Sequence, residues 1–595
     1  MTPTKTSVYD AMPWLKNYDH GVPHDLSDFT PSNICTLLDS AANEQPNATA
    51  IIFKDYRLTY SQLQRQAEIM AANFALHGVK PGDRVAIMMP NVPQLVPTFW
   101  AILKAGATLV MTNPLYMEAE MLHQMTDAGV RHLVSIPACW PKLNAMRFRL
   151  GVEKFFITDN SDVMGWPKRL LYKFMGKKDS SAPVVEYDNH QVFPYATLLQ
   201  GNKRLNVPYG DPKEQLALLQ YTGGTTGTPK GVMLSHANQS ANVEQIVSTL
   251  QVLKRKPQVF AALLPIFHVY GLSTCLLLPT ALRAATVMIP RYDPGEFLGL
   301  ISKHKISVFP GAPSVYLSLL QHKDFSRYDI SSLAYGISGS APIPAASLEK
   351  FQSISSCKLL EGYGLTESSP ITHITPAEGM QKFGSIGMPL PGTCARIVDM
   401  DVGTLEMPVG EPGELIVKGP QVMNGYYNRP DETAGALRNG WLYTGDIAYM
   451  DEDGYFYIID RKKDMAIVGG FNVYPREIDE VLLSHPGVKE AVSVAVAHPT
   501  RGEMVKAFVV PKDGVTLTAT EIAGFCRKQL AGYKVPRQVE FRDSLPRAAT
   551  GKILRRTLQA EEMAKYEAEK TAEAAGTSAD ADVPDETSSP NQVDS

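Results

Sequence analysis

The first half of the chain alternates short apolar runs with amphipathic stretches, and this alternation limits the folds open to it. Residues 50–53 and 85–89 have the length and composition of buried strands. Residues 60–78 and 94–106 have helical periodicity and end on glycine. Strands that alternate with helices build largely parallel sheets covered by helices. The same alternation recurs from about residue 215 to 390, so the sequence predicts an α/β fold.

The pattern of predicted strands and helices changes toward the C-terminus. From about residue 393, short alternating strands are separated by turn sequences such as Gly410-Glu411-Pro412-Gly413, which predicts a small β subdomain. After Lys463, a helix predicted at 475–484 precedes strands near 491–497 and 506–510, which indicates a small α+β domain. Several domains are expected, because a single core rarely grows beyond roughly 250–300 residues.

We therefore expect four segments. Residues 1–30 form an N-terminal extension, 31–462 a large domain, and 463–560 a small C-terminal domain, with the boundary near 461–464. Residues 561–595 are rich in Ala, Glu, Asp, Ser and Thr and have almost no large apolar side chains, so they are expected to form a disordered acidic tail.

Composition excludes some functions. The formal net charge is −4, which gives no general attraction to nucleic acid. The six cysteines are scattered without a C-x-x-C pair, which favours a reducing compartment over a disulfide framework or a zinc site. Residues 1–20 lack the apolar core of a secretory signal. We expect a cytoplasmic protein, with a homodimer as a candidate assembly.

Two segments bear on membranes. The most apolar region, residues 259–282, is interrupted by Pro265, Gly271 and Pro279, which favours a buried strand, turn and helix over a membrane span. Residues 166–178 combine aromatic, aliphatic and basic side chains. This composition suits either an anionic membrane surface or an ordinary surface helix. Peripheral contact with the inner face of the membrane is therefore an expectation.

A glycine- and threonine-rich loop is the strongest local signal. It reads Tyr221-Thr222-Gly223-Gly224-Thr225-Thr226-Gly227-Thr228-Pro229-Lys230-Gly231. Glycines let backbone N–H groups turn toward an anion, threonine hydroxyls add donors, and a lysine adds a positive charge. The loop does not fit the pattern G-x-x-x-x-G-K-[ST]. The loop therefore predicts polyphosphate binding through a motif other than that pattern. The alternative is a plain flexible turn.

Four further motifs follow the loop in order. They are Glu361-Gly362-Tyr363-Gly364-Leu365-Thr366-Glu367, the run from Asn439-Gly440-Trp441 through Thr444-Gly445-Asp446 to Asp460-Arg461-Lys462-Lys463, Gly469-Gly470-Phe471-Asn472, and Thr550-Gly551-Lys552-Ile553. Together the five motifs resemble the adenylate-forming superfamily of acyl-CoA synthetases, peptide-synthetase adenylation domains and luciferases. The resemblance covers roughly residues 30–560. The 439–463 run is similar to the fatty-acyl-CoA synthetase signature, and Gly532-Tyr533-Lys534-Val535-Pro536 also resembles the bacterial long-chain type of these ligases.

The resemblance implies a two-step reaction that uses ATP, Mg²⁺ and coenzyme A. A fatty acid would react with ATP to give acyl-AMP and pyrophosphate, and coenzyme A would then take the acyl group and release AMP. In this family residues 31–462 would be the AMP-binding domain, and residues 463–560 would be mobile between the two steps. The small-molecule partners would be the fatty acid, ATP and coenzyme A.

The resemblance also implies roles for individual residues. Nucleotide binding would fall to Tyr221, Thr222, Gly223, Gly224, Thr225, Thr226, Gly227, Lys230, Gly339, Ser340, Ala341, Glu361, Gly362, Tyr363, Asp446 and Arg461. The catalytic residues would be Lys552, Thr366, Glu367 and His268. The metal would bind Glu367 and Thr222, the hinge would be Lys463, and the coenzyme A channel would pass Gly469 and Gly470.

Within these sets the expected contacts are specific. Tyr363 would stack on adenine, Asp446 would accept both ribose hydroxyls, and Lys552 would bridge the carboxylate and the α-phosphate. Two positions depart from the family pattern: Tyr443 stands where histidine is frequent, and Gly469 where serine is usual.

Structural alternatives stay open for these residues. The alternatives are solvated lysines for Lys230 and Lys552, caps for Asp446 and Glu367, and core packing for Tyr363. The Gly-Lys contexts and the Thr-Glu pair favour function for the lysines and for Glu367, the ribose role is favoured for Asp446, and the two interpretations of Tyr363 are nearly balanced. A lone histidine such as His268 is commonly a satisfied core residue.

Alternative functions stay open too. They are a medium-chain or aryl-CoA ligase on the same scaffold, a fatty acyl-AMP ligase that stops at the adenylate, and a catalytically inactive lipid-binding scaffold.

Overall fold

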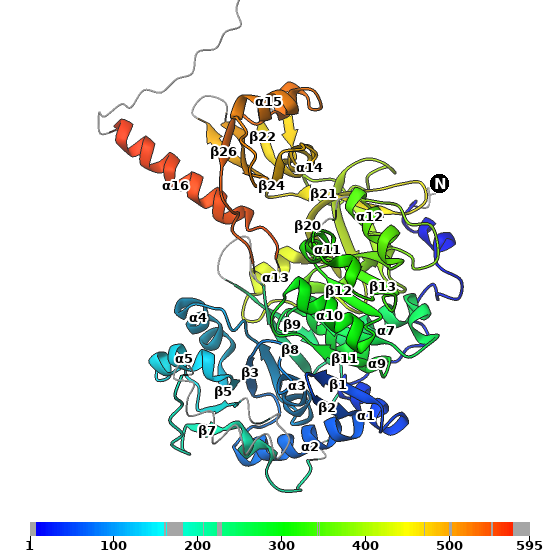
Figure 1. Ribbon diagram of the computed structural model, residues 1–595, viewed down its shortest axis with the longest axis vertical. Helices are drawn as coiled ribbons and strands as arrows, with labels where there is room; N and C mark the ends of the chain where they lie inside the picture. The colour runs from blue at the N-terminus through cyan, green and yellow to red at the C-terminus, as the bar shows by residue number, and fades with distance from the viewer. Residues whose placement is uncertain are drawn as a thin grey trace, which may run out of the picture. The chain divides into compact units, whose positions relative to one another are not determined.

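The computed structural model describes residues 7–159, 162, 183–205, 208–222, 229–341, 343, 345–468, 471–498, 502–548 and 551–574. The chain divides into two compact units (Figure 1). The first unit comprises Met1–Lys462 together with Arg547–Lys552, and the second comprises Lys463–Pro546 and Ile553–Ser595. The chain thus passes from the first unit to the second between Lys462 and Lys463.

One large sheet of the first unit has the strand order β16-β15-β14-β13-β12-β10-β11-β1-β2. The neighbours from β14 to β1 pair in parallel, whereas β2, β15 and β16 join by antiparallel pairs. Its strands are β1 (Thr49–Phe53), β2 (Tyr56–Thr59), β10 (Val259–Ala262), β11 (Ala285–Met288), β12 (Val308–Gly311), β13 (Tyr335–Ser338), β14 (Lys358–Gly364), β15 (Ile371–Ile374) and β16 (Met388–Pro389).

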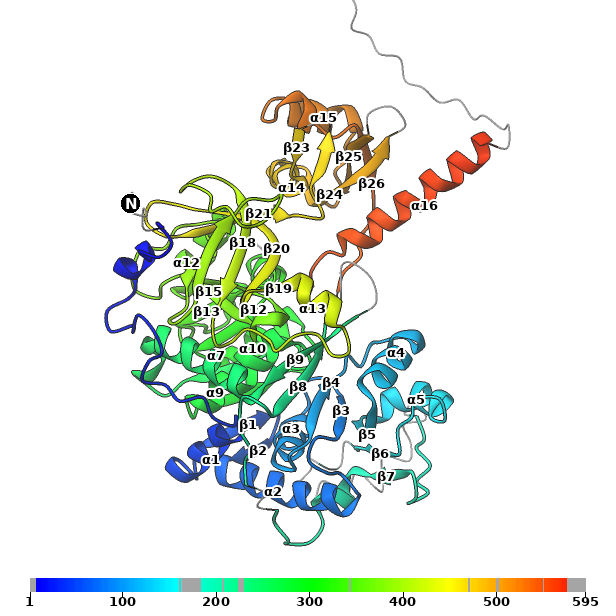
Figure 2. The ribbon, with the colours of Figure 1, turned by 180° about the vertical axis from the view of Figure 1, so that it is seen from behind.

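A second sheet has the order β7-β6-β5-β3-β4-β8-β9, parallel from β7 to β8 with an antiparallel β8–β9 pair. Its strands are β3 (Arg84–Met88), β4 (Thr108–Met111), β5 (Val130–Ser135), β6 (Lys154–Ile157), β7 (Val192–Pro194), β8 (Leu216–Tyr221) and β9 (Gly231–Ser235). Parallel neighbours require crossover connections, and helices supply most of them. Figure 2 shows these helices beside the strands from the opposite side.

The helices of the first unit follow from local signals. Helix α2 begins behind Thr59, whose side chain accepts the N–H of Gln62 in a capping box. Every residue of α3 is buried, which matches its apolar sequence. The helices are α1 (Cys35–Glu44), α2 (Tyr60–Leu76), α3 (Leu95–Lys104), α4 (Glu118–Ala128), α5 (Trp140–Met146), α7 (His236–Thr249), α8 (Val269–Leu272), α9 (Leu278–Ala281), α10 (Pro294–His304), α11 (Pro313–Leu320), α12 (Ala345–Ser355) and α13 (Pro430–Ala436).

The rest of the first unit is the predicted small β subdomain. An antiparallel sheet runs β17-β18-β20-β19, with β21 also paired to β20. Its strands are β17 (Cys394–Val398), β18 (Gly413–Lys418), β19 (Leu437–Arg438), β20 (Trp441–Met450) and β21 (Phe456–Arg461).

The second unit is a small α+β domain. Its sheet has the order β23-β22-β25-β24, and β26 pairs in parallel with β25. The elements are β22 (Ala466–Val468), β23 (Phe471–Val473), α14 (Pro475–Leu483), β24 (Val488–His498), β25 (Gly502–Pro511), α15 (Ala519–Arg527), β26 (Gln538–Phe541) and α16 (Arg555–Ala574). The predicted fold class is confirmed.

Helix α16 corrects one expectation. The chain is helical past residue 561, where the sequence predicted a disordered tail, and it stays helical to Ala574. Ala, Glu, Lys and Arg favour helix, and ion pairs tie α16 to the sheet. Lys506 Nζ of β25 lies 2.8 Å from carboxylate oxygens of both Glu540 and Glu562. The prediction for 575–595 lies outside the described residues.

The apolar 259–282 region is a buried strand followed by helical turns, as predicted. Strand β10 leads to α8, a π-helix (Ser273–Leu277) and α9. Among the described residues, no helix is long and apolar enough to cross a membrane. All six cysteines are free thiols. Residues 166–178, the predicted membrane-facing segment, lie outside the described part of the chain.

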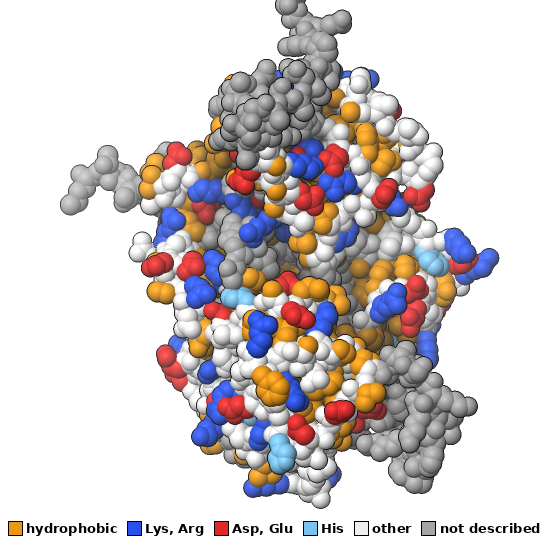
Figure 3. All heavy atoms as spheres, turned by 90° about the vertical axis from the view of Figure 1, so that its left-hand side faces the viewer, with side chains coloured by type: hydrophobic (Ala, Val, Ile, Leu, Met, Phe, Trp, Pro, Cys, Tyr) orange, Lys and Arg blue, Asp and Glu red, His pale blue; other side chains and the backbone are white. Residues whose placement is uncertain are grey.

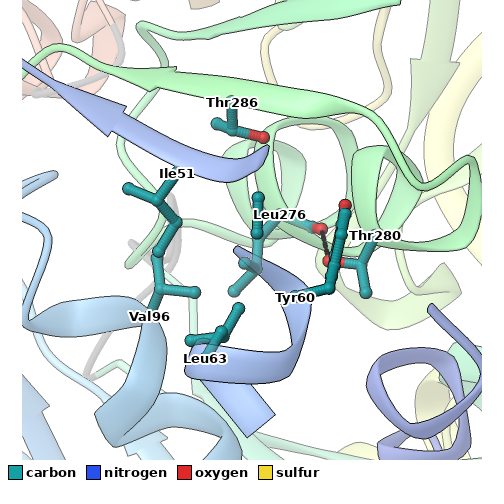
Figure 4. A pocket seen from close by; sticks show the side chains of 8 residues that line it. Ile51, Tyr60, Leu63, Val96, Leu276, Thr280 and Thr286 are labelled. Atoms are coloured by element: carbon teal, nitrogen blue, oxygen red, sulfur yellow. Dashed lines mark hydrogen bonds between the residues drawn. The ribbon is translucent and has the colours of Figure 1, made fainter. Parts of the chain in front are cut away.

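A small cavity lies where this helical segment meets α2 and α3. Figure 4 shows Ile51, Leu63, Val96 and Leu276 facing it, and Thr280 Oγ1 donates to the Leu276 carbonyl at 2.7 Å. Its volume is about 10 Å³, close to the least that holds one water molecule. This cavity is a packing defect of the core and is too small for an acyl chain.

Candidate active site

The glycine- and threonine-rich loop connects β8 and β9. Tyr221 ends β8 and pairs with Gly231, the first residue of β9. Just beyond, the Thr222 N–H donates to the Lys230 carbonyl at 3.1 Å. The hairpin therefore holds the two ends of the loop together. Gly223, Gly224, Thr225, Thr226 and Gly227 lie outside the described residues, so their contacts with phosphate stay a prediction, as does the metal contact of Thr222.

Tyr221 anchors the base of the loop. Its buried hydroxyl donates to Asp127 Oδ2 at 2.6 Å, and Asp127 Oδ1 also accepts from Arg429 Nη2 at 3.0 Å. A Cβ added to Gly231 would lie 3.1 Å from the Tyr221 ring, which explains the glycine. The structure thus places the Tyr221 hydroxyl in a protein contact, although the sequence predicted nucleotide binding.

Lys230 and Glu367 share one aromatic neighbour. Lys230 Nζ lies 4.5 Å from the centroid of the Tyr426 ring, and the Tyr426 hydroxyl donates to Glu367 Oε1 at 2.8 Å. The Met423 N–H donates to the Glu367 carbonyl at 2.8 Å, which fixes the backbone as well. The predicted phosphate lysine and the predicted magnesium carboxylate are therefore held by the same side chain.

The sequence did not predict a role for Tyr426 in the site. A tyrosine between glycine and a second tyrosine carries no signal in one sequence that separates it from core packing. The structure brings it to the site because Asn424 N–H and the Tyr427 N–H bond to carbonyls of Met233 and Gly231 in β9. The segment 424–427 therefore runs beside β9, the second strand of the hairpin that carries the loop.

Strands β13 and β14 bring two predicted nucleotide segments together. They pair in parallel, with Ser338 opposite Glu361, so Gly339-Ser340-Ala341, which follow β13, lie at the same end of the sheet as Glu361-Gly362-Tyr363, which lie in the C-terminal half of β14. Ligands of open α/β sheets bind at such carboxyl ends. A Cβ on Gly339 would lie 3.0 Å from the Tyr270 ring, so a side chain there would require its neighbours to shift. Ser340 and Ala341 are exposed, and Ser340 has a φ of 73°.

The turn after β14 carries Thr366 and Glu367 on a short 3₁₀ helix (Thr366–Ser368). Gly364 allows this turn, because a Cβ there would lie 1.8 Å from the Pro370 carbonyl oxygen. Thr366 and Glu367 are both half-buried, so their polar atoms stay within reach of a ligand.

Asp446 is the centre of the predicted ribose site. Its buried carboxylate accepts the Tyr363 hydroxyl at Oδ2 (2.6 Å), and Arg461 Nε lies 3.1 Å from Oδ1. Asp446 and Arg461 are direct partners in the β20–β21 ladder. Burial and then the Asp446 charge raise the pKa of Tyr363 well above its ordinary value, so the phenol remains a donor. Each Asp446 oxygen keeps a second lone pair for a ribose hydroxyl.

The Tyr363 ring packs against the ring of His373. Their ring centroids are 5.8 Å apart in an edge-on arrangement. Burial lowers the pKa of His373 to about 3, and its Nδ1 lies 2.9 Å from the Thr372 hydroxyl. The predicted stacking of Tyr363 on adenine is compatible with this fixed ring and stays a prediction.

Lys552 and His268 both belong to the first unit, and the charge of Lys552 acts on the His268 ring. Burial, followed by the positive charge of Lys552, lowers the pKa of His268 to about 4. His268 Nδ1 accepts the Tyr270 N–H at 3.3 Å, which places the proton of the neutral ring on Nε2. Gly551, with a φ of 84°, makes the turn before Lys552, and the Ala548 N–H donates to the Lys552 carbonyl. His268 is thus a neutral donor near an ammonium group.

Two predicted features are not tested by these contacts. Lys463 is the first residue of the second unit, but its role as a hinge is functional. Gly469 and Gly470 lie outside the described residues.

The site suits magnesium that arrives with ATP. In the part of the chain that the structure describes, no three His, Cys, Asp or Glu side chains are grouped to hold a metal. Mg²⁺ is commonly bound by one or two carboxylates together with substrate phosphates and water, and Glu367 supplies such a carboxylate.

Comparison with known proteins shows the family of this chain. Residues 38–427 match the AMP-binding enzyme family, and residues 477–552 match the AMP-binding enzyme C-terminal domain. The long-chain-fatty-acid–CoA ligase of Bacillus subtilis is 44% identical over 550 residues, which cover 92% of this chain and 98% of that protein. The Escherichia coli O6:H1 protein of the same name is 38% identical, covering 93% and 99%.

A solved structure agrees. ATP-bound MatB from Rhodopseudomonas palustris superposes with a TM-score of 0.76 at 29% identity, covering 89% of this chain and 99% of that one. The chain belongs to the AMP-binding, or adenylate-forming, enzyme family, and its curated relatives at 38–44% identity are bacterial long-chain fatty acid–CoA ligases.

Proposed function

We propose that this chain is a long-chain fatty acid–CoA ligase that uses ATP, Mg²⁺ and coenzyme A. The observation that carries the proposal is the grouping, in one unit, of the Asp446–Tyr363–Arg461 cluster and the Lys230–Tyr426–Glu367 contact, with His268 and Lys552 in the same unit. Relatives of this name that align over nearly their whole length support the choice of substrate.

In the first step a fatty carboxylate oxygen attacks the α-phosphorus of ATP. The bond from that phosphorus to the bridging oxygen breaks, and pyrophosphate leaves with Mg²⁺. Both reactants are anions, and two unit charges about 4 Å apart repel by about 4 kcal/mol at an effective dielectric constant near 20. Lys552 and Lys230 offset this repulsion at the two ends of the reacting group. Neutral His268 adds an Nε2–H donor for the carboxylate without a competing charge.

In the second step the thiolate of coenzyme A attacks the acyl carbonyl of acyl-AMP. The bond between the acyl carbon and the phosphate oxygen breaks, AMP leaves, and the thiol proton is released to solvent. We assign the turning of the second unit between the steps to Lys463, and passage of the pantetheine arm to Gly469 and Gly470. Asp446, held by Tyr363 and Arg461, keeps the nucleotide in place during both steps.

A series of acids tests the substrate class. Acetate, octanoate, palmitate, oleate and coumarate are each supplied with ATP, Mg²⁺ and coenzyme A, and AMP is measured. The proposal expects the highest kcat/KM for palmitate and oleate. Highest values for octanoate or coumarate would favour the medium-chain or aryl alternative, and adenylate without thioester would favour an acyl-AMP ligase.

We further propose that this cytoplasmic enzyme touches anionic membrane through the end of α5. Phe148 is 82% exposed, the Arg147 guanidinium lies 4.6 Å from the centroid of its ring, and Arg149 follows it in the sequence. An exposed aromatic ring preceded and followed in the sequence by arginines suits a surface of anionic lipid. Figure 3 shows one face of the molecule, on which acidic, basic and hydrophobic side chains are interspersed.

Flotation with vesicles tests the membrane contact. We expect binding to phosphatidylglycerol vesicles that falls several-fold in Phe148→Ala and stays unchanged in Leu76→Ala, a matched exposed apolar control on α2. Equal binding by both variants would contradict this contact. Sedimentation of the same samples without lipid decides whether the chain is a homodimer.

A further inference from the structure

Lys463 stands between two ion pairs, one on each side of it in the sequence. On the N-terminal side, Lys462 Nζ lies 2.9 Å from Glu414 Oε2 in the first unit. On the C-terminal side, Asp464 Oδ2 lies 3.6 Å from Arg555 Nη1 in the second unit. Each pair is contained in its own unit.

The first pair ties Lys462 to the ribose site. Glu414 lies on β18 with its side chain only 7% exposed, and its Oε1 accepts the Gly445 N–H at 3.1 Å. The Lys462 N–H in turn donates to the Gly445 carbonyl at 2.9 Å. Gly445 directly precedes Asp446. Lys462 is therefore held by both its backbone and its ammonium group, in fixed relation to the carboxylate that binds ribose.

The second pair ties Asp464 to the core of the second unit. Arg555 also donates through Nη2 to Asp479 on α14, and Asp479 Oδ1 accepts the Ser493 N–H of β24 at 2.5 Å. The side chains of Arg555, Asp464 and Asp479 are 19%, 16% and 12% exposed, so the cluster is largely shielded from water. Removing one member of such a buried cluster leaves a charge without its partner.

We propose that these two ion pairs confine the hinge to Lys463, and that Glu414, Lys462, Asp464 and Arg555 are positioning residues for the change between the two half-reactions. The proposal rests on the proposed function. Each residue has only two soft backbone dihedrals, so fixed neighbours leave few ways for the chain to turn at Lys463. Loss of either pair spreads the second unit over more orientations and lowers the fraction in each productive one.

The N-terminal pair is tested with Lys462→Met, Glu414→Gln and the double variant, using oleate, ATP, Mg²⁺ and coenzyme A. We expect each single variant to lower kcat about tenfold, which corresponds to about 1.4 kcal/mol in the population of productive states. KM for ATP should stay within about twofold, because Tyr363 and Arg461 still hold Asp446. The double variant should be no worse than either single one, as expected for a coupled pair.

Rescue and control variants separate this role from general damage. Lys462→Arg keeps the charge and should restore kcat to within about twofold of the parent, since either cation can pair with Glu414. Lys418→Met changes an exposed lysine at the end of the same strand as Glu414 and should leave kcat unchanged. Asp464→Asn tests the second pair and should lower kcat to a similar extent without raising KM for ATP.

Two results would overturn the proposal. One is a Lys462→Met enzyme with parental kcat, and the other is a rise in KM for ATP that accompanies the loss and is not rescued by Lys462→Arg. Both results count against the proposal only when the parent enzyme itself makes acyl-AMP and thioester. If the parent makes neither, the proposed function fails instead, so the two failures are distinct.

Discussion

The Tyr363 hydroxyl donates a 2.6 Å hydrogen bond to Asp446 Oδ2, joining the end of a parallel strand in the large sheet to the antiparallel β subdomain. Residues 83 positions apart thus build one polar surface. Burial keeps the phenol protonated, so it donates to Asp446 at all physiological pH values. The proposed ribose site is consequently preorganised before a nucleotide arrives.

Loss of this hydrogen bond should weaken ATP binding. A hydrogen bond to a charged group is worth about 1.5–3 kcal/mol, so Tyr363→Phe should raise KM for ATP roughly tenfold or more. Pyrophosphate release at varied ATP concentration gives KM. Tyr457→Phe removes a hydroxyl that donates to Asp451 in the β subdomain and should leave KM for ATP unchanged. Equal KM values for Tyr363→Phe and the parent would refute this role.

The two half-reactions should separate when Lys552 is removed. Lys552→Ala removes the charge that bridges the two anions, so acyl-AMP formation should fall roughly 10²–10³-fold. Thioester formation from supplied acyl-AMP should survive, because that step has no incoming carboxylate. Exposed Lys528→Ala serves as the control in the second unit. Equal loss in both half-reactions would argue against the assignment.

Tyr426 allows two interactions to be separated by two substitutions. Tyr426→Phe keeps the ring beneath Lys230 but removes the donor to Glu367, so it should raise the Mg²⁺ concentration that gives half-maximal rate. Tyr426→Leu removes the ring as well and should also raise KM for ATP, by several-fold for a contact worth about 0.5–2 kcal/mol. Binding of a fluorescent ATP analogue, with and without Mg²⁺, checks both. The same behaviour in the two variants would contradict the division of roles.

Buried neutral histidines should make folding sensitive to acid. Burial lowers the pKa of His236 and of His373 to about 3 in the folded protein, below an unfolded value near 6.5. Between these values the unfolded chain takes up protons that the native state excludes, so stability is full above pH 6.5 and falls as pH drops toward 3. Each group contributes about 1.4 kcal/mol per pH unit.

Thermal unfolding between pH 8 and 5 checks this slope. His373→Asn should lower stability at every pH. The dependence of stability on pH should be shallower between pH 6.5 and 5, because the unfolded variant has one histidine fewer to protonate. Exposed His190→Gln is the control and should leave the slope unchanged. An unaltered slope in His373→Asn would show that its burial does not govern the acid response.

Much of the fold followed from pattern alone, because strand and helix periodicities are local. The predicted strands at 50–53 and 85–89 lie within a residue or two of β1 and β3. Helix α16 was the exception at the C-terminus. Its Ala- and Glu-rich sequence indicates both helix and disorder, and the ion pairs of Lys506 that favour the helix join residues far apart in sequence.

The site was predictable only where residue types are unusual in their context. Asp446, Glu367, Lys230 and Lys552 stand in distinctive motifs, whereas Tyr426 and Glu414 do not. Those two act through long-range contacts, with Glu367 and with Lys462, that no single-sequence pattern encodes. The Tyr221 hydroxyl bonds to Asp127, a contact that its motif did not predict, and its contact with the nucleotide stays a prediction.

The central claim is that this site joins a fatty carboxylate to AMP. The most direct measurement is pyrophosphate release and acyl-AMP formation by the purified protein with oleate, ATP and Mg²⁺, before and after addition of coenzyme A. We predict stoichiometric acyl-AMP without coenzyme A, then sustained AMP release and oleoyl-CoA once it is added. Release of neither pyrophosphate nor acyl-AMP from an enzyme that binds ATP would contradict the account.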